Sequence, residues 1–248
     1  YRGREDFVYR IAVGELPFVT GIFPLGGQAG ARTRVEVKGW NLPGAKITQD
    51  LKNKTPGVYP VSVRGGEWTS NRVPFAVDTL TERLEREPND QPKTSLSVKI
   101  PVIVNGRIER PGDVDVVRFK GRAGEEIVAE VLARRLDSPL DSVLKLTDAA
   151  GKQLAANDDV EDKGAGLLTH QADSRIGCKL PKNGTYYVHL GDTQHKGGVE
   201  YAYRLRIGRP RPDFELRVAP ASVNARPGSA VPVTVYALRR DGFAGDIA

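Results

Sequence analysis

The stretch Glu85-Arg86-Glu87-Pro88-Asn89-Asp90 opens the part of the chain that decides the fold, which runs as far as Gly208. It is followed by Gly112-Asp113-Val114-Asp115 and by Leu140-Asp141-Ser142-Val143-Leu144-Lys145-Leu146-Thr147-Asp148. Asn183-Gly184-Thr185-Tyr186-Tyr187-Val188 closes the series. Apolar residues alternate with polar ones between turns rich in Gly, Asn and Asp. This period of two predicts short β-strands joined by hairpins.

This order of motifs resembles the bacterial pre-peptidase C-terminal (PPC) domain family. Members of that family are small β-sandwiches that accompany secreted peptidases and many other extracellular proteins. The resemblance implies a jelly-roll-like sandwich over residues 85–208 without catalytic activity of its own. It also implies that the chain belongs to a larger bacterial protein that is secreted, periplasmic or attached to the cell surface.

The residues before this sandwich form a second predicted domain, over residues 16–78. Short alternating strands are separated there by Gly and Pro turns, which is typical of a small all-β domain. Gly39-Trp40-Asn41-Leu42 follows the second predicted strand and resembles a turn of the immunoglobulin-like TIG family. Residues 79–84 are the predicted linker. The fold class is therefore all-β, with an immunoglobulin-like domain followed by a PPC-type sandwich.

The two ends of the chain predict further modules. Arg2–Gly14 aligns with Lys196–Gly208 at a constant offset, so residues 1–15 are interpreted as the terminal strand of a preceding PPC-like copy in a tandem array. After Gly208, the Pro residues of Arg209-Pro210-Arg211-Pro212 fix the backbone of a stiff joint. Residues 209–248 are the predicted start of a further immunoglobulin-like module, with Asp241-Gly242 as a hairpin turn.

Composition limits the classes of function. The chain has 248 residues, a formal net charge of +6 and one cysteine, so an internal disulfide is excluded. Basic and acidic residues alternate and no recognition helix accompanies them, which argues against nucleic acid as a partner. No apolar run approaches the roughly 20 residues of a membrane span. The densest basic stretch, Arg204 to Arg211, is interpreted as a solvated strand face.

The acidic opening segment is the sharpest candidate site. Calcium takes six to eight oxygen ligands, and the segment offers four oxygen-bearing side chains within a few residues. The resemblance implies a calcium site here, because collagen-binding members of the PPC family use this segment together with acidic residues of the following hairpin. The predicted metal ligands are Glu85, Glu87, Asn89 and Asp90, with Asp113 and Asp115 as the nearest counterparts of the hairpin acids. The alternative is an exposed opening turn without metal.

Other candidate sites are weaker. The loop Asn157–Gly164 is acidic but lacks the EF-hand spacing, so a solvated hairpin loop is favoured over a second calcium site. The aromatic residues Trp40, Trp68, Tyr59, Tyr187 and Tyr201 are interpreted as core or domain-seam residues in preference to a carbohydrate or protein platform. His170, His189 and His195 lie in no catalytic motif, and neither a nucleophile elbow nor a phosphate-binding loop occurs.

The sequence therefore predicts a non-catalytic structural or binding module of a larger secreted or cell-surface protein, with calcium as its only expected cofactor. Its expected partners are an extracellular polymer or protein and other domains of the same polypeptide. In one hypothesis the module belongs to an adhesive array that presents other domains. In the alternative it is an accessory region of a secreted peptidase that assists secretion, folding or substrate targeting.

Overall fold

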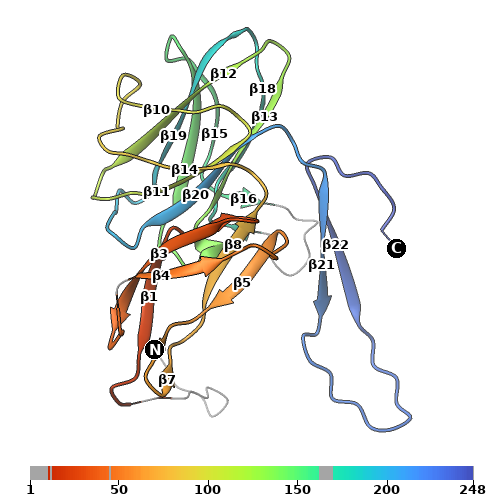
Figure 1. The fold of residues 1–248 in the computed structure, drawn as a ribbon. Helices are drawn as coiled ribbons and strands as arrows, with labels where there is room; N and C mark the ends of the chain where they lie inside the picture. Colours follow the sequence, from red (N-terminus) through yellow and green to blue (C-terminus); the bar gives the residue numbers. More distant parts are fainter. Residues whose placement is uncertain (1–10, 12, 45, 162–169, 248) are drawn as a thin grey trace. The chain divides into compact units, whose positions relative to one another are not determined.

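The structure, a computed structural model, describes residues 11, 13–44, 46–161 and 170–247, and these residues form β-strands together with one short 3-10 helix, η1 (Arg134–Leu136) (Figure 1). The predicted all-β class is confirmed. The chain divides into two compact units, Tyr1–Asp78 and Thr79–Ala248. The strand predicted over residues 1–15 falls largely outside the described residues.

The first unit contains two three-stranded sheets. One has the order β1-β3-β4 and the other the order β2-β8-β5. Val35 and Val37 are buried at alternate positions of β3, and Phe75 and Val77 are buried on β8, so the period of two places apolar side chains in the core. The bounds are β1 (Phe18–Phe23), β2 (Gly26–Gln28), β3 (Arg32–Trp40), β4 (Lys46–Asp50), β5 (Gly57–Val61) and β8 (Val73–Asp78), with the short pair β6 (Arg64–Gly65) and β7 (Trp68–Thr69).

The second unit contains two five-stranded sheets that share one hydrophobic core. Their orders are β10-β12-β19-β14-β15 and β18-β13-β20-β11-β9. Tyr186 and Val188 of one sheet and Leu205 and Ile207 of the other are fully buried in this core. The bounds are β9 (Glu82–Leu84), β10 (Leu96–Ser97), β11 (Val102–Arg107), β12 (Val114–Gly121), β13 (Glu126–Leu132), β14 (Ser142–Asp148), β15 (Gln153–Asn157), β18 (Arg175–Lys179), β19 (Gly184–Asp192) and β20 (Ala202–Gly208).

The second unit begins within one of these sheets. Residues 79–84 were expected to be a linker, but Glu82–Leu84 form β9, which pairs in parallel with β11. Strand β20 pairs antiparallel with the other edge of β11, so Glu82 and Arg206 are the two cross-strand partners of Ile103. The chain therefore enters and leaves this sandwich at the same end of one sheet.

Two arginines of β20 correct the expectation of a solvated basic face. Arg204 is only 1% exposed and Arg206 is 8% exposed. Arg204 pairs with Glu82 at 2.8 Å, and its Nη1 donates to Asn105 Oδ1 at 2.9 Å. Arg206 pairs with Glu130 at 3.1 Å. These charges are buried because distant strands supply partners for them, which a local pattern does not reveal.

The C-terminal residues form a separate two-stranded antiparallel sheet of β21 (Asp213–Ala219) and β22 (Thr234–Arg240). Phe214, Leu216 and Val218 alternate along β21 and are exposed. Asp241 follows β22 instead of forming the turn between the two strands, and its carboxylate pairs with Arg175 and Arg206. Another short pair is β16 (Val160–Glu161) with β17 (His170–Gln171).

Candidate metal centre

The acidic opening segment is held against β11 and β12 by its backbone. Glu85 N donates to Asn105 O at 2.9 Å, and Val116 N donates to Asn89 O at 3.1 Å. One oxygen of the Glu85 side chain also accepts the Arg107 N–H at 2.6 Å. The segment thereby runs beside the start of β12, where Asp113 and Asp115 lie in the sequence.

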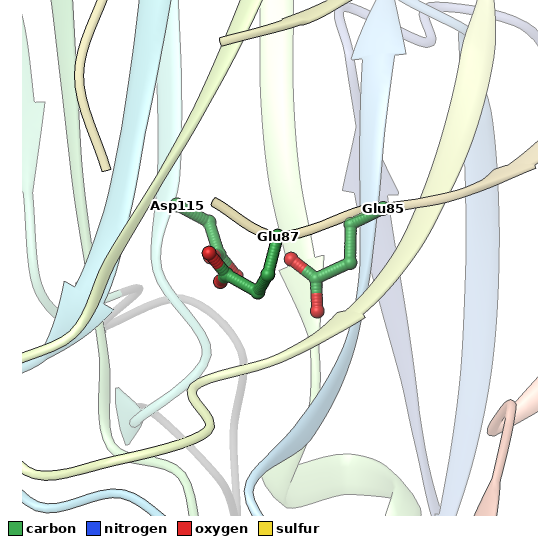
Figure 2. A group of neighbouring side chains, drawn as sticks. All are labelled: Glu85, Glu87 and Asp115. Carbon is green, nitrogen blue, oxygen red and sulfur yellow. The ribbon is translucent and has the colours of Figure 1, made fainter. Parts of the chain in front are cut away.

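Five acidic side chains meet at this place in two groups. Carboxylate oxygens of Glu85, Glu87 and Asp115 all lie within 4.8 Å of one another, and Figure 2 shows these three side chains converging. Carboxylate oxygens of Glu87, Asp90 and Asp113 meet the same limit. Because Glu87 belongs to both groups, they form one continuous acidic cluster. Asn89 joins it, since its Nδ2 donates to Glu85 Oε2 at 2.9 Å.

Several oxygens in the cluster are buried without a hydrogen-bond donor. They come from five of the six residues that the sequence proposed as ligands, and all of them are acceptors in the charged or amide state. Leaving such an atom unpaired in the interior costs about 1–3 kcal/mol. A cation coordinated by such oxygens would offset that cost. The atoms are Glu87 Oε1, Asn89 Oδ1, Asp90 Oδ1, Asp113 Oδ1 and Asp115 Oδ1.

Burial and mutual repulsion govern the protonation of the cluster. Burial, followed by the neighbouring Glu85 carboxylate, raises the pKa of Asp115 to about 10. Burial also raises the pKa of Glu85, which hydrogen-bonds to Asp115, and that of Glu87. Without a cation, burial and mutual repulsion therefore favour protonation of Asp115 beside Glu85.

Two residues that the sequence did not assign to the site complete it. The Tyr203 hydroxyl donates to Asp115 Oδ2 at 2.6 Å and to Glu85 Oε2 at 3.3 Å, and burial with these carboxylates holds the pKa of Tyr203 well above its usual 10. The Arg110 guanidinium lies 2.6 Å from Asp90 Oδ2 and 3.5 Å from Asp113 Oδ1. Tyr203 was not among the residues predicted for this site. A buried hydroxyl needs a partner, and that requirement is the signal that could have identified it.

Asn157 holds the described part of the second acidic loop through hydrogen bonds. Asn157 Nδ2 donates to Asp159 O at 2.6 Å, and Asn157 Oδ1 accepts the Arg175 N–H at 3.0 Å. Residues 162–169 of this loop lie outside the described residues. Among those described, the groups of acidic, His or Cys side chains close enough to share a metal ion are the two described above.

The predicted aromatic residues behave differently from one another. Trp40 is 64% exposed and Trp68 is 59% exposed, so neither lies in the core of the first unit. Trp40 is paired across two strands with Phe18, with the ring centroids 6.0 Å apart. The Tyr59 hydroxyl donates to Thr55 O at 3.0 Å.

Comparisons with known proteins connect the chain to a protease. A probable subtilase-type serine protease of Deinococcus radiodurans is 33% identical over 142 residues, a match that covers 54% of this chain and 18% of the protease. The pre-peptidase C-terminal domain of a collagenase from Bacillus anthracis aligns with a TM-score of 0.33 and 16% identity, over 50% of this chain and 99% of that domain. The resemblance to the PPC family described above concerns the sequence of residues 85–208, and we refer to these residues as the PPC-like segment.

The remaining comparisons add two facts. No family model matches the chain. None of the helices in the described residues has the length and apolar character needed to cross a membrane.

Proposed function

We propose that the PPC-like segment is a non-catalytic accessory module of a larger secreted peptidase and that calcium stabilises it. The similarity to a subtilase-type protease supports the accessory role, because the matched region covers only 18% of that protease. A secreted location is consistent with calcium, since extracellular modules bind it at about 10⁻⁴ to 10⁻³ M.

The observation that carries the calcium proposal is the set of buried oxygens without hydrogen-bond donors. Hard oxygen ligands from carboxylates and an amide suit calcium better than zinc or copper. Glu85, Glu87, Asn89, Asp90, Asp113 and Asp115 would hold the ion. The ion would supply positive charge that neutralises the carboxylates and ties the opening segment to the start of β12.

A calorimetric titration of calcium into metal-free protein tests this proposal. The titration is paired with melting curves in calcium and in EDTA, for the wild type, for Glu87→Gln and for Asp158→Asn. Glu87 belongs to both acidic groups, whereas Asp158 belongs to neither and accepts the N–H of the adjacent Asp159. At free calcium near 100 times the dissociation constant, the wild type and Asp158→Asn should gain about 2.7 kcal/mol of stability.

The result for Glu87→Gln decides the interpretation. Loss of both the binding heat and the stabilisation places the ion at the acidic cluster. If the wild type shows neither, the segment is an opening turn and the calcium proposal is rejected. The accessory role is tested separately by sequencing the full polypeptide that carries this chain, because a catalytic domain in it is expected under this proposal.

A second candidate function is adhesion, and the exposed pair of Phe18 and Trp40 favours it. Flat aromatic side chains on a surface cover apolar faces of sugars or anchor a protein partner with little loss of entropy. Binding of the purified chain to cell-wall polysaccharide should then fall for Trp40→Ala and remain for Tyr59→Phe. Equal binding by wild type and Trp40→Ala would reject this surface.

A further inference from the structure

Arg110 supplies a positive charge to the acidic cluster from within the chain. We propose that Arg110 is a built-in counter-ion that competes with the cation for Asp90 and Asp113, and thereby sets the cation concentration at which the site fills. This inference rests on the proposed calcium site and adds a residue that regulates it.

The contacts of Arg110 are with the second acidic group. Its Nη2 lies 2.6 Å from Asp90 Oδ2 and 3.5 Å from Asp113 Oδ1. The other oxygen of Asp113, Oδ2, accepts the Glu109 N–H at 2.7 Å. Asp113 Oδ1, the oxygen nearest the guanidinium, is thus the Asp113 oxygen left for a cation. Arginine and cation would contact the same atom.

Differences in exposure indicate which partner moves. The side chain of Arg110 is 63% exposed, whereas that of Asp113 is 1% exposed and that of Asp90 is 37% exposed. The carboxylates of Asp90 and Asp113 are therefore less exposed than the guanidinium of Arg110, most of which is in contact with solvent. A divalent ion at Asp113 would repel the guanidinium, which can turn into water at low cost.

The backbone of Arg110 is fixed independently of its side chain. Arg110 O accepts the Asp113 N–H at 3.1 Å, which closes the turn Arg110-Pro111-Gly112-Asp113. Gly112 supplies the positive φ of 79° that this turn requires. A substitution of the Arg110 side chain should therefore leave the turn intact.

The two acidic groups are consequently stabilised by different partners when no metal is bound. Glu85 and Asp115 of the first group accept hydrogen bonds from the Tyr203 hydroxyl. Asp90 and Asp113 of the second group face Arg110. Loss of Arg110 removes a counter-ion only from the metal-free state, because the cation replaces it in the bound state.

Calcium titration by calorimetry of the wild type, Arg110→Gln, Arg110→Lys and Arg86→Gln tests the inference. Arg86 is exposed and lies between Glu85 and Glu87 in the sequence, so Arg86→Gln removes the same charge nearby and serves as the matched control. We expect Arg110→Gln to bind calcium about tenfold more tightly, as loss of one close unit charge predicts. Arg110→Lys keeps the charge and should stay near the wild type, and so should Arg86→Gln.

Melting temperatures provide a second readout. Arg110→Gln should melt below the wild type in EDTA and together with it in saturating calcium, because the ion pair exists only without metal. Equal or weaker calcium binding by Arg110→Gln, with normal binding by the wild type, would overturn the role of Arg110 alone. Absence of binding in both proteins would instead reject the calcium site and this inference with it.

Discussion

Tyr203 shows how one buried hydroxyl supports the acidic cluster. It donates to Asp115 at 2.6 Å and to Glu85 at 3.3 Å from within the core, where it is fully buried. Hydrogen bonds to charged acceptors are stronger than those to neutral ones. Removing the donor costs the most free energy when the acceptor is buried. The hydroxyl therefore contributes to stability and also orients two of the proposed ligands.

We predict that Tyr203→Phe lowers the free energy of unfolding in EDTA by about 2–3 kcal/mol. The matched control is Tyr186→Phe, because the equally buried Tyr186 hydroxyl donates only to the neutral Lys182 O at 2.6 Å. That change should cost about 1 kcal/mol. Urea unfolding of the three proteins measures the difference. Equal losses in the two variants would show that the carboxylates add nothing to the bond.

The pKa of Asp115 predicts an unusual dependence of stability on pH. Its pKa rises from 3.8 to about 10 on folding, so between these values the folded state binds more protons than the unfolded state. The free energy of unfolding in EDTA should therefore fall as pH rises from 6 to 9, by up to about 1.4 kcal/mol per pH unit. Calcium should reduce this slope, because the cation takes the place of the proton.

Urea unfolding at several pH values, in EDTA and in calcium, measures the slope. Asp115→Asn cannot titrate and serves as the control, so its stability in EDTA should change less with pH over the same range. A wild type whose stability in EDTA is the same at pH 6 and pH 9 would contradict the prediction.

At the scale of elements, Asp241 anchors the β21–β22 hairpin to the sandwich of the second unit. Its carboxylate pairs with Arg175 of β18 and Arg206 of β20, and it also accepts the Arg211 N–H at 2.6 Å. A two-stranded sheet is at best marginally stable by itself. The hairpin therefore depends on this anchor for its order.

We predict that Asp241→Asn releases the hairpin and leaves the sandwich folded, because Arg206 keeps its ion pair with Glu130. Trypsin should cleave after Arg217 and Arg239 faster in the variant, and hydrogen exchange along β22 should accelerate. Asp213→Asn, at the exposed start of β21, should behave as the wild type. Unchanged cleavage and exchange in Asp241→Asn would show that other contacts hold the hairpin.

The sequence predicts regular elements well and pairing over long distances poorly. Alternation alone identifies β3, β19 and β20, because a half-buried strand requires it. The three-residue β9 escapes prediction, since it is defined by its parallel pairing with β11 and not by its own pattern. The local sequence predicts that Arg204 lies at the surface, because its partners Glu82 and Asn105 are distant in the sequence and are brought beside it only by the fold.

The same limit applies to the candidate site. The six candidate ligands were named from the acidic opening segment and, for Asp113 and Asp115, from the hairpin that the resemblance to the PPC family implies. Their separation into two groups that share Glu87, and the contacts of Tyr203 and Arg110, depend on the fold. Whether calcium binds there remains a prediction.

At the scale of the whole molecule, the two compact units have separate hydrophobic cores. Phe75 is 1% exposed in the first core and Phe119 is 2% exposed in the second. Replacing a buried Phe by Ala costs about 3–5 kcal/mol through lost burial and the cavity that remains. The two substitutions should therefore act on different unfolding transitions.

We predict that calorimetric melting resolves a calcium-sensitive transition, from the second unit, and a calcium-insensitive one, from the first. Phe75→Ala should lower only the insensitive transition, and Phe119→Ala only the sensitive one. A single transition that both substitutions shift equally would show that the two units unfold together.

The shared end at which the chain enters and leaves the second sandwich has a mechanical consequence. Glu82 and Arg206 flank the same residue of β11, so the two attachment points are separated by two strand spacings, roughly 10 Å. Tension between Asp78 and Arg209 would pull across the strands and peel β9 away one residue pair at a time. Once β9 has detached, the next contacts to break are those of Glu85, where the acidic cluster begins. A cation bound there would raise the force needed to unfold the sandwich.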